Sequence, residues 1–314
     1  QGINIVFSGS TNGWIPNSDI ANALTPVYPP TQKGIFAFGT TASANISLSN
    51  LVNSSGVVAA DVTGVGTART AVAACSYGGD KAIFGYGSGD KSMTNLVSNS
   101  GVISADVTGV GTGRYDLAAV KYGNDKGMFG FGDGASGDVS LTNLITNQGV
   151  VGTDVTGVGT ARQGLAAASY GGDKAIFGFG RANTTVVDET NLVSNQGVVA
   201  SDVTGVGTDR HQLAATQYGG DKAIFGFGER VSMTNLVSNT GVVSADVTGV
   251  GTAREDLAAT NYGGDKGLFC YGNDSGGVAS MKNLVSNTGV VSADVTGVGT
   301  DRSACGGAGY SQTA

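Results

Sequence analysis

The chain has 314 residues, of which 54 are glycine and only 13% are charged, and its formal net charge is -7 at pH 7. This negative charge argues against nucleic-acid binding, because affinity for nucleic acids comes mainly from Lys and Arg contacts with phosphates. No segment has the run of about 18 to 20 apolar residues that a membrane helix needs, so we expect no membrane insertion. Abundant glycine together with valine and alanine favours short strands joined by tight turns.

Residues 1–32 differ in composition from the rest of the chain. They contain the only tryptophan and all four prolines, which are Trp14, Pro16, Pro26, Pro29 and Pro30. We interpret this segment as an N-terminal arm that docks to other subunits of an assembly. Its stretch 3–9 is similar to the second strand of the repeat described next, so the arm contains a candidate edge strand.

Residues 33–314 are built on an internal repeat of 44 to 48 residues. The heptapeptide Asp-Val-Thr-Gly-Val-Gly-Thr occurs six times, and an arginine follows each copy after one residue. The heptapeptides begin at Asp61, Asp106, Asp154, Asp202, Asp246 and Asp294, and the arginines are Arg69, Arg114, Arg162, Arg210, Arg254 and Arg302. A period of this length is typical of the four-stranded blades of β-propellers.

Each repeat contains four strand-like segments separated by turn sequences. After Arg162 these segments are 165–170, 175–180, 190–194 and 198–203. The Gly-Gly-Asp and Asn-x-Gly sequences between them supply the positive φ angles that tight hairpins require. Helical periodicity is absent. We therefore predict an all-β fold, a six-bladed β-propeller with four strands in each blade.

The two ends of the repeat region complete one blade between them. Segment 33–62 contains the second, third and fourth strands of a repeat, whereas 303–310 contains only a first strand. We expect this C-terminal strand to join the N-terminal blade and close the ring, which would remove an exposed sheet edge. The predicted domains are the arm at 1–32 and the propeller at 33–314.

The order of these segments resembles the kelch repeat. A copy consists of an arginine, a small apolar strand ending in Tyr-Gly-Gly, a strand ending in Phe-Gly-Phe-Gly, and the strands Asn-Leu-Val and Val-Val. The chain departs from kelch repeats at the end of the second strand and in lacking a tryptophan near the fourth. Tandem copies reading DKAIFGFG are also similar to arrays in tailed-phage virion proteins. The resemblance to kelch repeats implies a propeller, and the resemblance to phage arrays implies a virion or extracellular location, in a tail fibre, a tail tip or a capsid-associated component.

Variation among the six copies is concentrated on one face of the predicted ring. The loop between the second and third strands changes in length and content, and so do the two positions that follow each arginine. Both regions lie on the same face of a propeller, and the two positions after each arginine lie around the channel mouth. We predict a ligand-binding surface there, formed by Tyr115, Asp116, Gln163, His211, Gln212, Glu255 and Asp256. Drift of unconstrained loops is the alternative interpretation.

The six arginines form a predicted structural ring. Each pairs with a repeat aspartate in one interpretation, and in the other they hold an anion or a glycan carboxylate at the channel. The aspartates are expected in Asx-type turns, because valines and glycines occupy the positions where a calcium loop has its other ligands. Cys75, Cys270 and Cys305 occupy different repeat positions, which indicates neither a disulfide framework nor a zinc site. We expect no metal and no cofactor.

The leading functional hypothesis is a non-enzymatic virion-exterior protein that recognises a host-cell glycan or protein through the variable face. His211 is the only histidine, and Glu255 and Asp256 are adjacent and expected to point to opposite faces of a strand, so no residue set supports catalysis. The alternatives are a purely structural module that docks through residues 1–32, and a secreted glycan-active enzyme.

Overall fold

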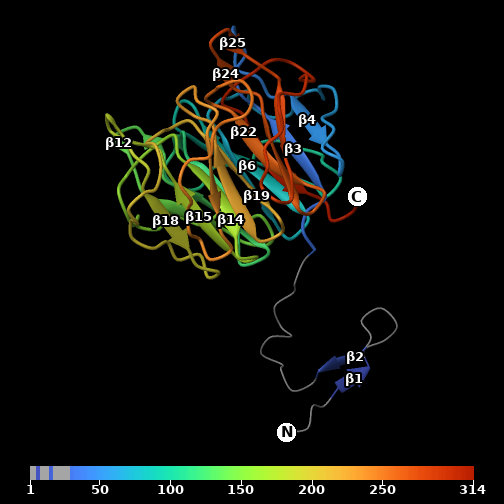
Figure 1. The fold of residues 1–314 in the computed structure, drawn as a ribbon. Coiled ribbons are helices and arrows are strands. Elements are labelled where there is room, and N and C mark those ends of the chain that lie inside the picture. Colours follow the sequence, from blue (N-terminus) through green and yellow to red (C-terminus); the bar gives the residue numbers. More distant parts are fainter. Residues whose placement is uncertain (1–4, 8–13, 17–28) are drawn as a thin grey trace.

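The computed structural model describes residues 5–7, 14–16 and 29–314, and this part of the chain contains strands and no helix (Figure 1). The strands form small antiparallel sheets of two or three members. Within the described residues no helix is long and apolar enough to cross a membrane. The prediction of an all-β fold is confirmed.

The first two strands belong to the predicted arm. β1 (Ile5–Phe7) pairs with β2 (Trp14–Pro16) in a two-stranded antiparallel sheet. The stretch that is similar to a second strand therefore pairs with a neighbouring part of the arm. Residues 1–4, 8–13 and 17–28 lie outside the described residues, and the docking role of the arm stays a prediction.

Six three-stranded sheets repeat one pattern, in which a first strand pairs with a second and the second also pairs with a third. Five of these sheets are continuous in sequence: β5 (Ala73–Tyr77), β6 (Lys81–Gly87) and β7 (Lys91–Val97); β9 (Ala118–Tyr122), β10 (Lys126–Gly130) and β13 (Thr142–Ile145); β14 (Ala166–Tyr170), β15 (Lys174–Gly178) and β18 (Thr190–Val193); β19 (Ala214–Tyr218), β20 (Lys222–Gly226) and β21 (Thr234–Val237); β22 (Ala258–Tyr262), β23 (Lys266–Cys270) and β26 (Lys282–Val285). The sixth combines β27 (Gly306–Tyr310) with β3 (Lys33–Ala37) and β4 (Ser49–Val52).

The sixth sheet joins the two ends of the repeat region. β27 and β3 pair in register, from Gly306 opposite Ala37 to Tyr310 opposite Lys33. The predicted pairing of the C-terminal strand with the N-terminal segment is therefore confirmed.

The first strands also contact one another from sheet to sheet, in the order β5, β9, β14, β19, β22, β27 and back to β5. Backbone hydrogen bonds near the ends of these strands link the same pairs of neighbouring sheets. Gly78 N–H donates to the carbonyl of Asp125 in the next sheet, and Ser311 N–H, just after β27, donates to that of Asp80. Each sheet is thus held against the sheets on both of its sides.

The outermost segment of each repeat pairs only in part with the third strand. Next to β4, Val52 bridges Val58 and Ser49 bridges Val62, with no continuous strand between the two bridges. The Asn50 side chain donates to a backbone carbonyl of the outer segment at 3.0 Å. The predicted fourth strand is therefore reduced to two isolated bridges, because the outer segment has three residues (59–61) between them where the third strand has two (50–51).

The core lies between neighbouring sheets, where aromatic rings pack on glycines. The ring centroids of Phe131 and Phe177 are 5.2 Å apart. Gly130, the last residue of β10, lies directly beneath the second of these rings, since a Cβ at Gly130 would be 2.7 Å from Phe177 Cζ. This close approach explains why glycine alternates with aromatic residues in the second strands.

We expect Gly178→Ala to lower the free energy of unfolding by about 1–3 kcal/mol, the usual cost of overpacking a core. The added Cβ would lie 2.8 Å from Phe225 Cζ in the next sheet. Gly152→Ala is the matched control, because its nearest atom is 3.5 Å away and Ala59 and Ser104 occupy the same repeat position. Urea unfolding of both variants measures the difference. Equal stabilities would contradict the packing argument.

Candidate functional site

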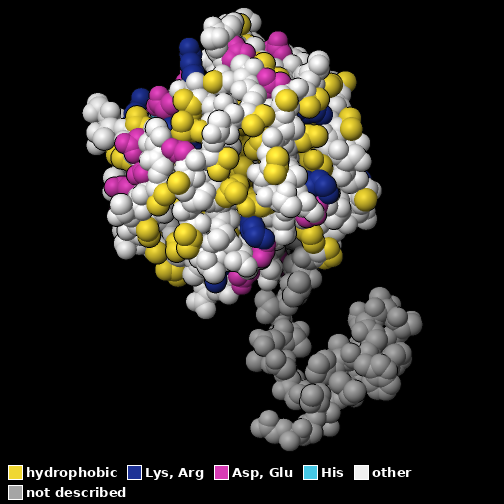
Figure 2. All heavy atoms as spheres, in the orientation of Figure 1, with side chains coloured by type: hydrophobic (Ala, Val, Ile, Leu, Met, Phe, Trp, Pro, Cys, Tyr) yellow, Lys and Arg dark blue, Asp and Glu magenta, His cyan; other side chains and the backbone are white. Residues whose placement is uncertain are grey.

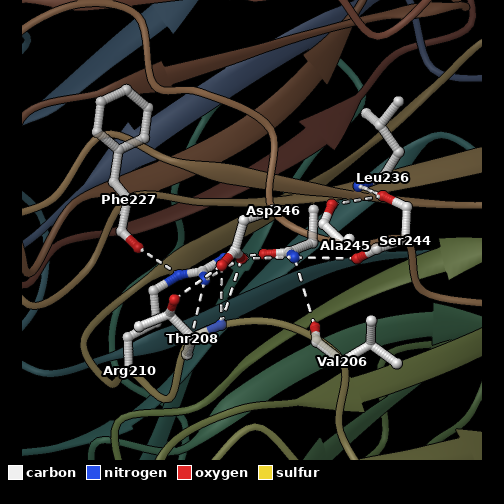
Figure 3. A network of polar contacts seen from close by, with 9 residues as sticks. Val206, Thr208, Arg210, Phe227, Leu236, Ser244, Ala245 and Asp246 are labelled. Carbon is white, nitrogen blue, oxygen red and sulfur yellow. Dashed lines mark hydrogen bonds and ion pairs between the residues drawn. The ribbon is translucent and has the colours of Figure 1, made fainter.

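Arg210 illustrates the environment of the six repeat arginines, which are all at most 1% exposed. Its guanidinium carbon lies 4.4 Å from the centroid of the Phe179 ring in the preceding sheet. Its Nε donates to the Phe227 carbonyl at 3.0 Å, and its Nη1 lies 3.5 Å from Asp246 Oδ1 (Figure 3). A single side chain thus connects two sheets and neutralises a carboxylate.

The same arrangement recurs in the other copies. Each guanidinium lies 3.9–4.6 Å from the centre of an aromatic ring, a cation–π distance. Five of the arginines have an aspartate oxygen of the repeat within 3.5–3.9 Å: Arg69, Arg162, Arg210, Arg254 and Arg302. None of the six lines either of the cavities described below. This placement fits a structural role and gives no support to an anion-binding ring.

The repeat aspartates connect successive copies of the heptapeptide. Thr208 Oγ1 donates to Asp246 Oδ2 at 2.7 Å from one repeat earlier, and Asn235 Nδ2 donates to Oδ1 at 2.9 Å. Burial raises the pKa of Asp246, but these hydrogen bonds and the charge of Arg210 hold it below its usual value. The carboxylate accepts from a neighbouring repeat, rather than from its own turn as the Asx-type interpretation predicted.

A cavity of about 80 Å³, here called the rim cavity, opens where the first strands begin. It is lined by the second residue after each repeat arginine and by the residue that follows it. The second residues are Ala71, Asp116, Gly164, Gln212, Asp256 and Ala304, and the following residues are Val72, Leu117, Leu165, Leu213, Leu257 and Cys305. Polar side chains from three different repeats therefore meet above apolar neighbours.

The backbone holds these second residues in one conformation. All six have φ between 48° and 61°, in the left-handed region. Gln212 N–H donates to the Gly164 carbonyl at 2.7 Å, and Asp256 N–H donates to the Gln212 carbonyl at 2.9 Å. The expectation that Glu255 and Asp256 alternate along a strand is wrong, because the left-handed residue turns the chain before β22 begins.

Two carboxyl groups of the rim cavity have raised pKa values. Burial and the nearby carboxylate of Asp133 raise the pKa of Asp116 to about 6. Burial and the carboxylates of Asp116 and Glu255 raise the pKa of Asp256 to about 7. Both effects disfavour the ionised form of the carboxyl groups. A positively charged group that entered the cavity would favour the ionised form, so these two residues are candidates for binding a cation.

We expect the folded protein to gain stability as the pH falls from about 7 to about 4. In this window the folded state binds more protons at Asp116 and Asp256 than the unfolded state, where their pKa is near 3.8. Below that window the trend reverses, because the repeat aspartates have lowered pKa values and lose their contribution when protonated.

The measurement is the urea midpoint between about pH 5 and pH 8 for the parent chain and for the double variant Asp116→Asn, Asp256→Asn. The variant should be more stable at the high end and should show a flatter profile. A parent profile that rises with pH over this range would contradict the assignment.

The other four predicted residues lie outside the lining of the rim cavity and pair with the variable loops. Tyr115 Oη donates to Asp133 Oδ2 at 2.6 Å. Gln163 Nε2 donates to Asp138 Oδ1 at 2.9 Å, and both of these aspartates belong to one short hairpin. That hairpin consists of β11 (Asp133–Gly134) and β12 (Gly137–Asp138), and β11 also pairs with β8 (Arg114–Tyr115).

His211 and Glu255 make similar contacts in other repeats. His211 Nδ1 lies against the Glu229 carboxylate, and Arg230 Nε donates to Glu255 Oε1 at 2.8 Å. The loops in two further repeats are the hairpins β16 (Arg181–Ala182) with β17 (Thr185–Val186), and β24 (Asn273–Asp274) with β25 (Gly277–Val278). The first position after the arginine therefore fixes a loop, while the second position faces the cavity.

Sequence reasoning missed the loop partners Asp133, Asp138, Glu229 and Arg230. The signal that would have found them is a charged side chain in a loop where most other copies carry uncharged or oppositely charged residues at the same position, as at Asp133, Arg181 and Glu229. It also missed a second cavity of about 70 Å³, lined by residues in the middle of the first strands and by Thr31. We call it the lysine cavity, because Lys121 is its only charged residue.

Cys75, Cys270 and Cys305 are buried free thiols. Burial raises the pKa of Cys75 and of Cys270 to about 12, which keeps these thiols protonated and unreactive at neutral pH. No group of three or more His, Cys, Asp or Glu side chains comes together as a metal site in the part of the chain that the structure describes. The polar side chains of the rim cavity are thus the two carboxyl groups of Asp116 and Asp256 and the amide of Gln212.

Comparison of the chain with protein-family models gave no match, and comparison with curated proteins gave no match either. Function is consequently argued from the geometry of the two cavities and the variable loops.

Proposed function

We propose that the six sheets, with their outer segments, are the blades of a closed, kelch-like six-bladed β-propeller, and that it serves as a non-enzymatic recognition module. The cyclic order of contacts among the first strands supports closure, as does the β27–β3 pairing. In this arrangement the rim cavity is one mouth of the central channel.

The observation that carries the proposal is the convergence of residues that differ between repeats. Asp116, Gln212 and Asp256 come from three repeats and line one cavity, and Gln212 Nε2 donates to Asp256 Oδ2 at 3.2 Å. The surrounding loops are fixed by side chains such as Tyr115 that also differ between repeats. A binding surface typically has residues that differ between repeats gathered around one opening, on a scaffold whose sequence is the same in every repeat.

The chemistry of the cavity favours a ligand with a positively charged or hydrogen-bond-donating group. Two carboxyl groups and an amide oxygen accept hydrogen bonds, and the neighbouring leucines accommodate a small apolar body. An amino sugar or a lysine side chain on a host-cell surface has these properties. We propose that the module is displayed on a virion exterior, in a tail fibre, a tail tip or a capsid-associated component.

An array of glycans and peptides, probed with the full chain, tests this function. Binding to amino sugars or lysine-containing peptides should fall about tenfold or more in Asp256→Asn, because a charge-assisted hydrogen bond contributes about 1.5–3 kcal/mol. Asp173→Asn is the matched control, since Asp173 lies in a turn between first and second strands and accepts from Asn195. Binding that Asp256→Asn leaves unchanged, or no binding to either ligand class, would contradict the proposal.

A second candidate function, a structural docking module, is favoured by a repeated apolar surface. The exposed large hydrophobic residues in the described part of the chain are all valines of the outer segments, which we call the valine belt. In each repeat the first valine of Gly-Val-Val or Gly-Val-Ile is 55–66% exposed: Val57, Val102, Val150, Val198, Val242 and Val290. Figure 2 shows apolar side chains spread over the visible surface between scattered charges.

Such a belt suits contact with neighbouring subunits, because exposed apolar side chains that recur along one surface are typical of protein–protein contact sites. Sedimentation of the full chain with its assembly partners tests this function. The double variant Val198→Lys, Val242→Lys should lose association, whereas Thr184→Lys in an exposed loop should retain it. Association that survives in the valine variant would rule out the belt as the docking surface.

A further inference from the structure

The lysine cavity lies farther along the first strands than the rim cavity, which opens at their beginning. Its lining includes the residue that precedes the strand-ending tyrosine in every copy, and this residue differs from copy to copy: Ser76, Lys121, Ser169, Gln217, Asn261 and Gly309. The turns on this side of the molecule are nearly identical in sequence. The first strands beside them nevertheless contain a second position that varies between repeats, and it lines a cavity that all six first strands share.

Lys121 lines the cavity without a counter-ion, unlike four of the turn lysines. Its Nζ makes no hydrogen bond or ion pair with any of the described residues, and the cavity lining contains no Asp or Glu. By contrast, four of the turn lysines pair with the preceding aspartate, as Lys126 does with Asp125 at 3.5 Å and Lys266 with Asp265 at 2.9 Å. Burial lowers the pKa of Lys121.

The other polar groups of the cavity are already engaged. Ser76 Oγ donates to the Gly309 carbonyl at 2.7 Å, and Ser169 Oγ donates to the Lys121 carbonyl at 2.8 Å. Asn261 Nδ2 donates to Thr31 Oγ1 at 2.7 Å. These bonds fix the wall of the cavity and leave the Lys121 ammonium as its charged donor without a partner.

We propose that the lysine cavity is an anion-binding site in which Lys121 pairs with a carboxylate or phosphate group. A partly buried charge without a counter-ion is costly, and an anion in the cavity would remove that cost. The volume of about 70 Å³ is roughly twice the 30 Å³ share of one water molecule, so the site accommodates one small group. That group is a free ion or the acidic end of a larger molecule, such as a sugar acid or a peptide C-terminus.

The first test uses the reactivity of the amine in the intact chain. A lysine with a lowered pKa is acylated faster than exposed lysines near pH 8, and a bound anion should block the reaction. With phosphate or acetate at ten times its dissociation constant, acylation of Lys121 should slow about tenfold. Peptide mass spectrometry measures this, with Lys126 as the internal control that neither anion protects. If neither anion slows the acylation of Lys121, the proposal is overturned.

The second test uses calorimetric titration with inorganic phosphate, acetate and a sugar acid. Lys121→Met should abolish binding, whereas Lys126→Met should leave it intact. Other copies carry serine, glutamine or asparagine at this position, so the variant is expected to fold, and its urea midpoint verifies that. Binding of phosphate or acetate as tight as that of the sugar acid identifies a site for a free ion. Tighter binding of the sugar acid identifies a site for the acidic end of a larger ligand. Equal binding by Lys121→Met would refute the site while leaving the rim cavity and its Asp256 test unaffected.

Discussion

Arg162→Ala is expected to destabilise the protein by about 3–5 kcal/mol, the cost of removing one partner from a buried, charged network. The substitution leaves the Asn191 Oδ1 and Phe179 carbonyl acceptors without their donor, and it removes the charge 3.7 Å from Asp202. It also removes the guanidinium that stacks on Phe131. Urea unfolding at pH 7 measures the loss.

Substitutions of two other arginines serve as controls for the loss of stability in Arg162→Ala. Arg230→Ala removes an exposed ion pair with Glu255 and should cost about 0–1 kcal/mol. Arg302→Ala should cost less than Arg162→Ala, because Arg302 keeps the bond from Nη2 to Asn50, but its Nε and Nη1 have no hydrogen-bond partner among the described residues. Equal losses at Arg162 and Arg302 would show that the contacts common to both, with the aromatic ring, the aspartate and the asparagine, account for the stabilisation, and that the additional hydrogen bonds of Arg162 do not.

Removal of residues 303–314 is expected to abolish cooperative folding. The truncated chain would lack β27, which pairs with β3 over five residue pairs and buries Ala308 and Tyr310. Loss of one large buried side chain alone costs about 3–5 kcal/mol, and the freed edge of β3 would be open to pairing with other chains. Chemical unfolding and light scattering measure the loss of cooperativity and the resulting aggregation.

A rearranged chain provides the control for this truncation. Placing residues 303–314 ahead of Lys33 through a short glycine linker makes the sixth sheet continuous in sequence. This chain should recover the unfolding midpoint of the parent, because the same strand pairs are formed without joining distant ends. A truncated chain as stable as the parent would contradict closure through β27.

Much of this fold could be predicted because its signals are local and repeated six times. Glycine and asparagine positions determined the turns, since only these residues readily adopt positive φ there. The missing first strand before Lys33 and the unpaired strand after Arg302 determined that the two ends share a sheet. Comparison of the copies with one another also identified Asp116, Gln212 and Asp256 as variable positions.

Tertiary structure alone decided how these positions work. Phe179 and Asp256 have φ of 63° and 52°, a conformation that sequence patterns do not predict for such residues and that their contacts with neighbouring sheets hold in place. The bond from Thr208 to Asp246 and the isolation of Lys121 likewise depend on which repeats lie side by side. The sequence by itself therefore determined the strands, the turns and the pairing of the ends, because those follow from local backbone preferences. Burial, charge pairing and pKa were decided only by the stacking of the sheets, because they arise between residues that are distant in sequence.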